Sequence, residues 1–128
     1  MRILLDTHIF LWFVDDNPRL SSRFADLIED ENNIVYLSIA SLWEMSIKYN
    51  LGKLTLKLNY NEFIESEVVA SNINLLNIEL AHIKTNAILP FHHRDPFDRL
   101  IISQSIVEKI PIITVDSVFS QYPVSVIS

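Results

Sequence analysis

The chain has 128 residues and a formal net charge of −6, with 49% hydrophobic and 20% charged residues, one glycine and no cysteine. This composition is typical of a globular protein with its own core, and it excludes a disordered chain and any site that needs a thiolate. The negative charge argues against a protein that coats duplex nucleic acid. It is compatible with an enzyme whose acids gather around a bound cation, because the cation reverses the local charge.

We expect one domain over residues 1–128, since a single glycine and no low-complexity tract leave no candidate linker. No apolar run approaches the roughly 18–20 residues that are needed to cross a bilayer. Asp6 comes too early for a signal peptide, and no small-residue cleavage site follows it. We therefore expect a cytoplasmic protein that has no contact with a membrane.

The first half of the chain alternates short apolar runs with amphipathic segments. The pattern predicts strands at residues 3–5 and 34–37, and helices at residues 7–14, 22–30 and 39–50. Ser21 or Ser22 is expected to cap the second of these helices and Ser38 the third. Gly52 stands where a residue of positive φ should end the third helix. Residues 53–58 are compatible with a short extended piece or a turn.

The second half predicts helices at residues 61–70, 79–89 and 96–109, and strands at residues 73–78, 111–115 and 123–127. Pro90 should stop one helix, whereas Asp95 and Pro96 should start the next as its N-cap and first helical residue. Pro123 favours an edge position for the last strand. Short apolar strands that alternate with helices indicate an α/β fold with a mainly parallel sheet.

Four acids belong to segments that end or begin at one edge of such a sheet: Asp6, Glu44, Asp98 and Asp116. Ligand sites in parallel sheets lie beyond the carboxyl ends of the strands, so we expect these acids to meet there. Several adjacent carboxylates take up protons unless a cation joins them. Ligands that are all oxygen atoms suit Mg²⁺ or Mn²⁺, which activate water and neutralise charge on a scissile phosphate.

Each acid also has an ordinary structural explanation. Asp6 and Asp116 would each cap the segment that follows, and Asp98 would complete a capping box. Glu44 and Lys48 are four residues apart, so an exposed ion pair of about 0.3–0.5 kcal/mol is an alternative for Glu44. The inner face expected for that helix consists of Ile39, Leu42, Trp43, Met45 and Ile47. We favour a metal site because all four acids point to one edge.

Four segments, in this order, resemble the motif series of PIN-domain ribonucleases. They are LLDTH at residues 4–8, SLWEMSIK at 41–48, DPFDRLI at 95–101 and ITVD at 113–116. The resemblance covers nearly the whole chain and extends to the VapC-like toxins of bacterial type II toxin–antitoxin systems. It implies a PIN-like three-layer α/β/α fold with a mainly parallel central sheet. It also implies a Mg²⁺- or Mn²⁺-dependent endoribonuclease that forms a homodimer and binds a cognate small antitoxin protein.

The resemblance implies a role for each residue that matches a position of the family motifs. Asp6, Glu44 and Asp98 resemble the three core metal-binding acids, and Asp116 resembles a more variable fourth. Asp6 and Asp98 would hold the main ion, whereas Glu44 and Asp116 would position water or a second ion. Thr7 and Thr114 are candidates for orienting metal-bound water or phosphate oxygens, and Asp95 is mainly an N-cap. Because this set contains no nucleophile, the attacking group should be water.

Other polar residues have less specific expectations. His92, His93 and Arg94 should form an exposed loop that contacts RNA phosphate or a partner. A transition-metal site made of His8, His92 and His93 is disfavoured, because the adjacent pair cannot easily chelate one ion and nothing holds His8 near that pair. Arg99 could contact phosphate or pair with Asp95. Three further cations could form an RNA track or a solvated face: Lys48, Lys53 and Lys57.

Two other functions fit parts of the pattern. One is a PIN-like nuclease that acts on DNA or processed RNA without an antitoxin. The other is a receiver-like module that binds Mg²⁺ without catalysis, but a receiver needs a lysine near the end of a late strand, where residues 114–116 read Thr-Val-Asp. A haloacid-type phosphatase would need an aspartate two residues after Asp6, where His8 stands. The identity of the RNA and the number of ions stay open.

Overall fold

Five parallel strands form one sheet in the order β3-β2-β1-β4-β5 in the computed structural model, which describes residues 1–128. The strands are β1 (Arg2–Leu5), β2 (Ile34–Ser38), β3 (Asn74–Leu76), β4 (Ile112–Ile113) and β5 (Val126–Ile127). Each strand overlaps a predicted one, and β5 lies at the edge of the sheet, as expected. Leu5 pairs with Leu37 and with Ile113, so the carboxyl ends of the three central strands are level.

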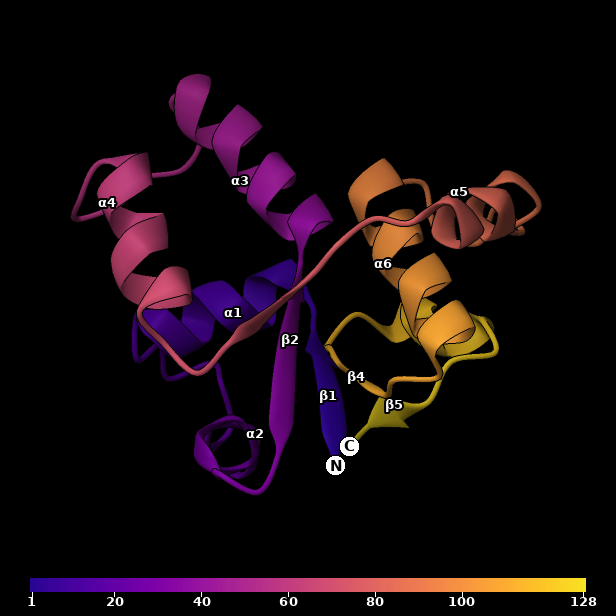
Figure 1. Ribbon diagram of the computed structural model, residues 1–128, viewed down its shortest axis with the longest axis horizontal. Helices are drawn as coiled ribbons and strands as arrows, with labels where there is room; N and C mark the ends of the chain where they lie inside the picture. The colour runs from indigo at the N-terminus through magenta and orange to yellow at the C-terminus, as the bar shows by residue number, and fades with distance from the viewer.

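The helices cover both faces of this sheet. They are α1 (Thr7–Val14), α2 (Ser22–Glu29), α3 (Ile39–Asn50), α4 (Tyr60–Ile64), α5 (Leu80–Ala87) and α6 (Pro96–Glu108). A π-helical segment, η1 (Glu65–Val69), continues α4, and a 3-10 helix, η2 (Ser117–Gln121), follows β4. Figure 1 shows α1, α2 and α4 on one side of the strands and α5 and α6 on the other. The expected three-layer α/β/α fold is confirmed.

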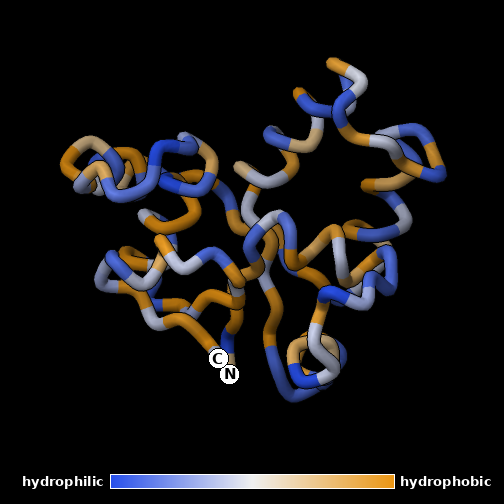
Figure 2. The backbone as a smooth tube through the Cα atoms, turned by 180° about the vertical axis from the view of Figure 1, so that it is seen from behind, coloured by the Kyte–Doolittle hydropathy of each residue, from blue (hydrophilic) through white to orange (hydrophobic).

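Two hydrophobic clusters hold the layers together, one on each face of the sheet. Alternate residues of β1 enter different clusters, because side chains of a strand point alternately to its two faces. Ile3 and Leu5 pack against residues of α1, α2 and α4, whereas Leu4 packs against residues of α6. The hydrophobic stretches of the chain accordingly converge on the strands (Figure 2). Strand β1 is therefore fixed from both sides, and so is Asp6, which follows it.

Helix α3 buries only part of the face predicted. Met45 is buried and Leu42 packs against the first cluster, as expected, but Trp43 is 54% exposed and Ile47 is also exposed. Ala40, Ser41 and Glu44 are buried instead. The helix leaves the end of β2 and packs beside α6, where small and polar side chains allow a close approach. Because apolar residues occur on nearly all sides of α3, their periodicity did not identify the face that would be covered.

Smaller differences concern the segment after α3. Gly52 has a φ of 73°, as expected for the residue that follows a helix end. Residues 53–58 contain bends and no strand, and the helix predicted at 61–70 consists of α4 and the π-helical η1. None of the helices combines the length and the apolar composition that crossing a bilayer requires.

Candidate metal centre

Asp6 lies at the carboxyl end of β1 and is the N-cap of α1. It is 3% exposed, and its Oδ1 accepts the backbone N–H of His8 at 2.9 Å. Its Oδ2 accepts the hydroxyl of Thr114 at 2.6 Å, and Thr114 Oγ1 in turn accepts the backbone N–H of Asp116 at 3.0 Å. Thr114 therefore joins the ends of β1 and β4 and fixes the orientation of the Asp6 carboxylate.

Hydrogen bonds keep Asp6 ionised. Burial alone would raise the pKa of Asp6, but its hydrogen bonds with His8 and Thr114 outweigh burial and lower this pKa. The same interaction with Asp6 raises the pKa of His8, whose Nδ1 lies 3.8 Å from Asp6 Oδ1. The end of β1 therefore presents a fixed negative charge.

Glu44 reaches the same edge of the sheet from α3. It is 2% exposed, its Oε2 accepts a hydrogen bond from Lys48 Nζ at 2.6 Å, and its Oε1 is buried without a partner. The pair expected with Lys48 therefore forms, but its carboxylate is not on the surface. A buried carboxylate oxygen without a partner is costly, and a cation would satisfy it. The helix is tied to the start of α1 by Thr7 Oγ1 and Ser41 Oγ, which lie 2.8 Å apart.

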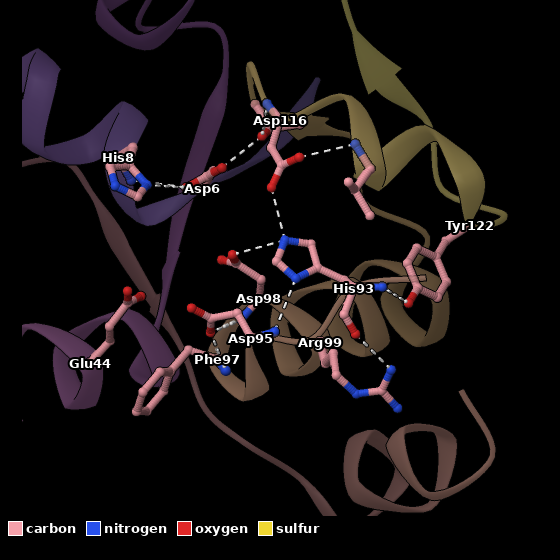
Figure 3. Close-up of polar contacts among 12 residues, drawn as sticks. Asp6, His8, Glu44, His93, Asp95, Phe97, Asp98, Arg99, Asp116 and Tyr122 are labelled. Carbon is pink, nitrogen blue, oxygen red and sulfur yellow. Dashed lines mark hydrogen bonds and ion pairs between the residues drawn. The ribbon is translucent and has the colours of Figure 1, made fainter. Parts of the chain in front are cut away.

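The start of α6 separates the roles of its two aspartates. Asp95 Oδ1 accepts the backbone N–H groups of Phe97 and Asp98 at 2.8 and 3.2 Å, and Pro96 is the first helical residue, as predicted. Asp98 points away from this cap and into the site (Figure 3). Burial, together with the nearby charges of Asp6, Asp95 and Glu44, raises the pKa of Asp98 to about 7. This shift is the proton uptake expected of grouped carboxylates.

His93 lies between two of the acids, and the prediction of an exposed loop was wrong for this residue. Its Nε2 is 2.8 Å from Asp116 Oδ2 and 3.2 Å from Asp98 Oδ2, and its side chain is 13% exposed. His92 and Arg94 are exposed, as expected. The signal that could have identified His93 is its position two residues before the N-cap Asp95, which places it where the chain turns into α6.

Arg99 supports the loop that carries His93. Its guanidinium donates to the carbonyl oxygens of Leu89, Pro90 and His93 at 3.0, 2.9 and 3.2 Å. It is buried, points away from the acids and lies 4.0 Å from the ring centroid of Phe91 (Figure 3). Of the two alternatives for Arg99, pairing with Asp95 is therefore wrong. Arg99 orients the loop and is not placed to orient a substrate.

The four predicted acids lie at one edge of the sheet, although not as one compact cluster. Ligand atoms of His93, Asp98 and Asp116 lie within 4.8 Å of one another. Asp6 and Glu44 approach from the other side, close enough to raise the pKa of Asp98 (Figure 3). Carboxylate oxygens, one of them buried and unpaired, fit a hard divalent cation. A cavity of about 740 Å³ lies elsewhere, beside Ile28, Asn33 and Asn74, at the amino ends of β2 and β3.

The chain resembles known proteins over almost its full length. A family model for the PIN domain matches residues 3–124. A chain in the crystal structure of VapBC2 from Rickettsia felis bound to a DNA fragment has 19% identity and a TM-score of 0.73, covering 100% of this chain and 98% of that one. A chain of FitAcB from Neisseria gonorrhoeae has 16% identity and a TM-score of 0.70, covering 98% and 96%.

A third similar structure is VapBC-1 from nontypeable Haemophilus influenzae. It has 19% identity and a TM-score of 0.65, covering 94% of this chain and 91% of that one. Likenesses at this level of identity show a shared fold. No curated protein sequence matches the chain.

Proposed function

The chain belongs to the PIN domain family, and from this premise we propose that it is a Mg²⁺- or Mn²⁺-dependent endoribonuclease, the toxin of a toxin–antitoxin pair. The observation that carries the proposal is that Asp6, Glu44 and Asp98 lie at one edge of the sheet, near enough for the charges of Asp6 and Glu44 to raise the pKa of Asp98. There Glu44 Oε1 is buried without a partner, and the pKa of Asp98 is about 7. A cation would satisfy the unpaired oxygen, and it would offset the repulsion between carboxylates that raises this pKa.

Some residues of the site would bind the cation, and others orient those ligands. Asp6 and Asp98 would hold the main ion with Glu44 Oε1 nearby, and Asp116 would position water or a second ion. When bound, such an ion activates water and neutralises charge that develops on a phosphate. Thr114 keeps Asp6 oriented, and Asp95 fixes the backbone of Asp98. The attacking group is water, because no side chain of this set is a nucleophile.

Partners follow from the family and from the charge of the site. The similar structures are VapBC and FitAB assemblies, so we propose that this chain also binds a cognate small antitoxin protein. A site rich in acids, in a chain with a net charge of −6, suits a cationic segment of that partner. We also propose a homodimer, since Trp43, Ile47 and Leu51 leave apolar surface exposed on α3. Its RNA substrate would be met in the cytoplasm.

Cleavage of RNA tests the proposal. The purified chain is incubated with a structured RNA and with DNA of the same sequence, in Mg²⁺, in Mn²⁺ and with EDTA. We expect cleavage of the RNA that needs the cation and that is lost in Asp6→Asn and Asp98→Asn. Asp26→Asn, which neutralises an exposed acid on α2, is the matched control and should cleave like the wild type. Equal cleavage by all four proteins would contradict the assignment of the site.

The same assay separates the alternatives. Cleavage of DNA in place of RNA would indicate a PIN-like nuclease with another substrate. Binding of Mg²⁺ without cleavage of either polymer would favour a non-catalytic module. The toxin role is tested separately by co-expression. A reading frame just upstream that encodes a small DNA-binding protein should relieve growth inhibition by this chain, and failure to do so would contradict the pairing.

A further inference from the structure

We propose that His93 is a positioning residue of the acidic site, which holds the Asp98 and Asp116 carboxylates through one Nε2–H group and is not itself a metal ligand. The inference rests on the proposed metal site and adds to it a residue that lies outside the four acids. His93 lies where a histidine ligand would be expected, because its Nε2 is within 3.2 Å of oxygens of both acids. The contacts of its other ring nitrogen decide between a ligand and a hydrogen-bond donor.

The backbone of Asp95 determines which nitrogen of His93 carries the proton. The Asp95 N–H donates to His93 Nδ1 at 3.1 Å, so the lone pair of Nδ1 is occupied (Figure 3). A neutral imidazole that accepts at Nδ1 must carry its hydrogen on Nε2. Nε2 then donates to Asp116 Oδ2 at 2.8 Å, and Asp98 Oδ2 lies 3.2 Å from the same nitrogen. A metal ligand would need a lone pair at Nε2, and this arrangement does not provide one.

Two buried side chains hold the backbone of His93 from opposite directions. The His93 N–H donates to the hydroxyl of Tyr122 at 2.7 Å, and the His93 carbonyl oxygen accepts from Arg99 Nη1 at 3.2 Å. The Tyr122 hydroxyl also donates to the Pro90 carbonyl oxygen at 2.6 Å. The ring of His93 packs edge-on against Phe119, with 5.6 Å between the ring centroids. Side chains of α6, η2 and the residue after η2 thus fix both the backbone and the ring.

The donor selects which carboxylate oxygens remain available to a cation. Asp116 uses Oδ1 to accept the Val118 N–H and Oδ2 to contact His93, so each of its oxygens already has one partner and keeps one lone pair for water or an ion. His93 contacts only Oδ2 of Asp98, which leaves Oδ1 free of the imidazole. Without the donor, the two carboxylates would repel one another and lose this orientation. Groups that orient metal ligands in this way typically change metal affinity about 10–100-fold when they are removed.

The first test is nuclear magnetic resonance of the ion-free protein. Long-range ¹H–¹⁵N spectra of the ¹⁵N-labelled full chain should show His93 as the tautomer with hydrogen on Nε2, whereas exposed His92 should show a mixture. His93→Gln identifies the signals. A His93 tautomer with its hydrogen on Nδ1 would overturn the inference.

The second test is the affinity for Mn²⁺, measured by isothermal titration calorimetry. We expect His93→Ala to weaken binding about 10–100-fold. His93→Gln should recover part of this loss through its amide donor, and Tyr122→Phe should weaken binding less than His93→Ala. His92→Gln, in the same loop but outside the site, is the control and should bind like the wild type. Circular dichroism verifies that each variant is folded.

Three results bear on the outcome in different ways. Unchanged affinity in a folded His93→Ala variant would overturn the inference and leave the proposed function standing. So would an electron spin echo signal from a nitrogen bound directly to Mn²⁺ that disappears in His93→Ala. A wild-type protein that binds no Mn²⁺ would overturn the proposed metal site and this inference together.

Discussion

Asp98 is the residue at which burial and the charges of three other acids act together. They raise its pKa to about 7, well above the ordinary value of an aspartate. A carboxyl group with a raised pKa in the folded state stabilises the fold below its unfolded pKa, and this contribution is lost as the pH rises through the folded value. Because of Asp98, the ion-free protein should therefore lose stability between about pH 4 and pH 7.

Asp98→Asn should stabilise the ion-free protein at pH 8, because it removes a carboxylate that is buried among other carboxylates. The pKa of Asp98 is raised from 3.8 to about 7, and one pKa unit corresponds to about 1.4 kcal/mol. We therefore expect the free energy of unfolding to rise by up to about 4 kcal/mol at pH 8 and by much less at pH 5. Urea unfolding in EDTA at both pH values measures the difference, with Asp26→Asn as the control. A lower stability of Asp98→Asn at pH 8 would contradict this electrostatic description.

Mn²⁺ binding should depend on pH through the same residue. Below pH 7 the cation must displace a proton from Asp98, so affinity should rise by up to about tenfold per pH unit and level off near pH 8. Calorimetric titrations at pH 6, 7 and 8 test this expectation. A pH-independent affinity would show that Asp98 does not take part in binding.

At the scale of elements, the N-terminus of α6 is the feature that sequence predicted most fully. Asp95 and Pro96 have known roles at helix starts, and these roles depend only on neighbouring backbone groups. Asp6 was found in the same way, because it follows a short apolar strand. Local chemistry is sufficient where a residue and its partners are close in sequence.

Asp95→Ala tests the cap. Loss of Oδ1 removes two hydrogen bonds to backbone N–H groups, and we expect a loss of about 1 kcal/mol in the free energy of unfolding. Asp95→Asn retains a cap oxygen and should cost less, because asparagine caps helices about as well as aspartate. Chemical denaturation of the two variants gives the comparison. Equal losses would show that the charge of Asp95, rather than its capping oxygen, stabilises the helix.

The face of α3 and the place of His93 could not be predicted in this way. Both depend on partners that are distant in sequence: α3 packs beside α6, and His93 meets Asp116 and Tyr122. The inner face of α3 was assigned to its apolar residues, and Met45 is buried as assigned, but Trp43 and Ile47 are exposed and Glu44 is covered in their place. Glu44 was therefore identified through the position of its helix after a strand and through the motif series, and not through the periodicity of that helix.

At the scale of the whole molecule, β1 connects the two hydrophobic clusters. Ile3 and Leu5 belong to one cluster and Leu4 to the other, so the two helical layers share a strand. We predict that residues 1–128 unfold as one cooperative unit. Trp12, packed against the first cluster, and far-ultraviolet circular dichroism should then report the same denaturation midpoint.

Leu4→Ala makes this prediction specific. Truncation of a fully buried leucine costs about 2–5 kcal/mol, and the change faces only the cluster beneath α6. In a cooperative molecule both probes should shift together and by the same amount. A shift in circular dichroism without a matching shift in Trp12 fluorescence, in a variant with Trp43 replaced by Phe, would show that the two layers unfold separately.

The central claim is that Asp6, Glu44 and Asp98 together hold a divalent cation at the carboxyl edge of the sheet. Its most direct test is anomalous X-ray diffraction from crystals of the full chain grown at pH 8 with Mn²⁺. We predict a manganese peak coordinated by carboxylate oxygens of Asp6 and Asp98, near Glu44 Oε1. The claim would be contradicted by a peak bound only to His93 and Asp116, or by no peak at this edge.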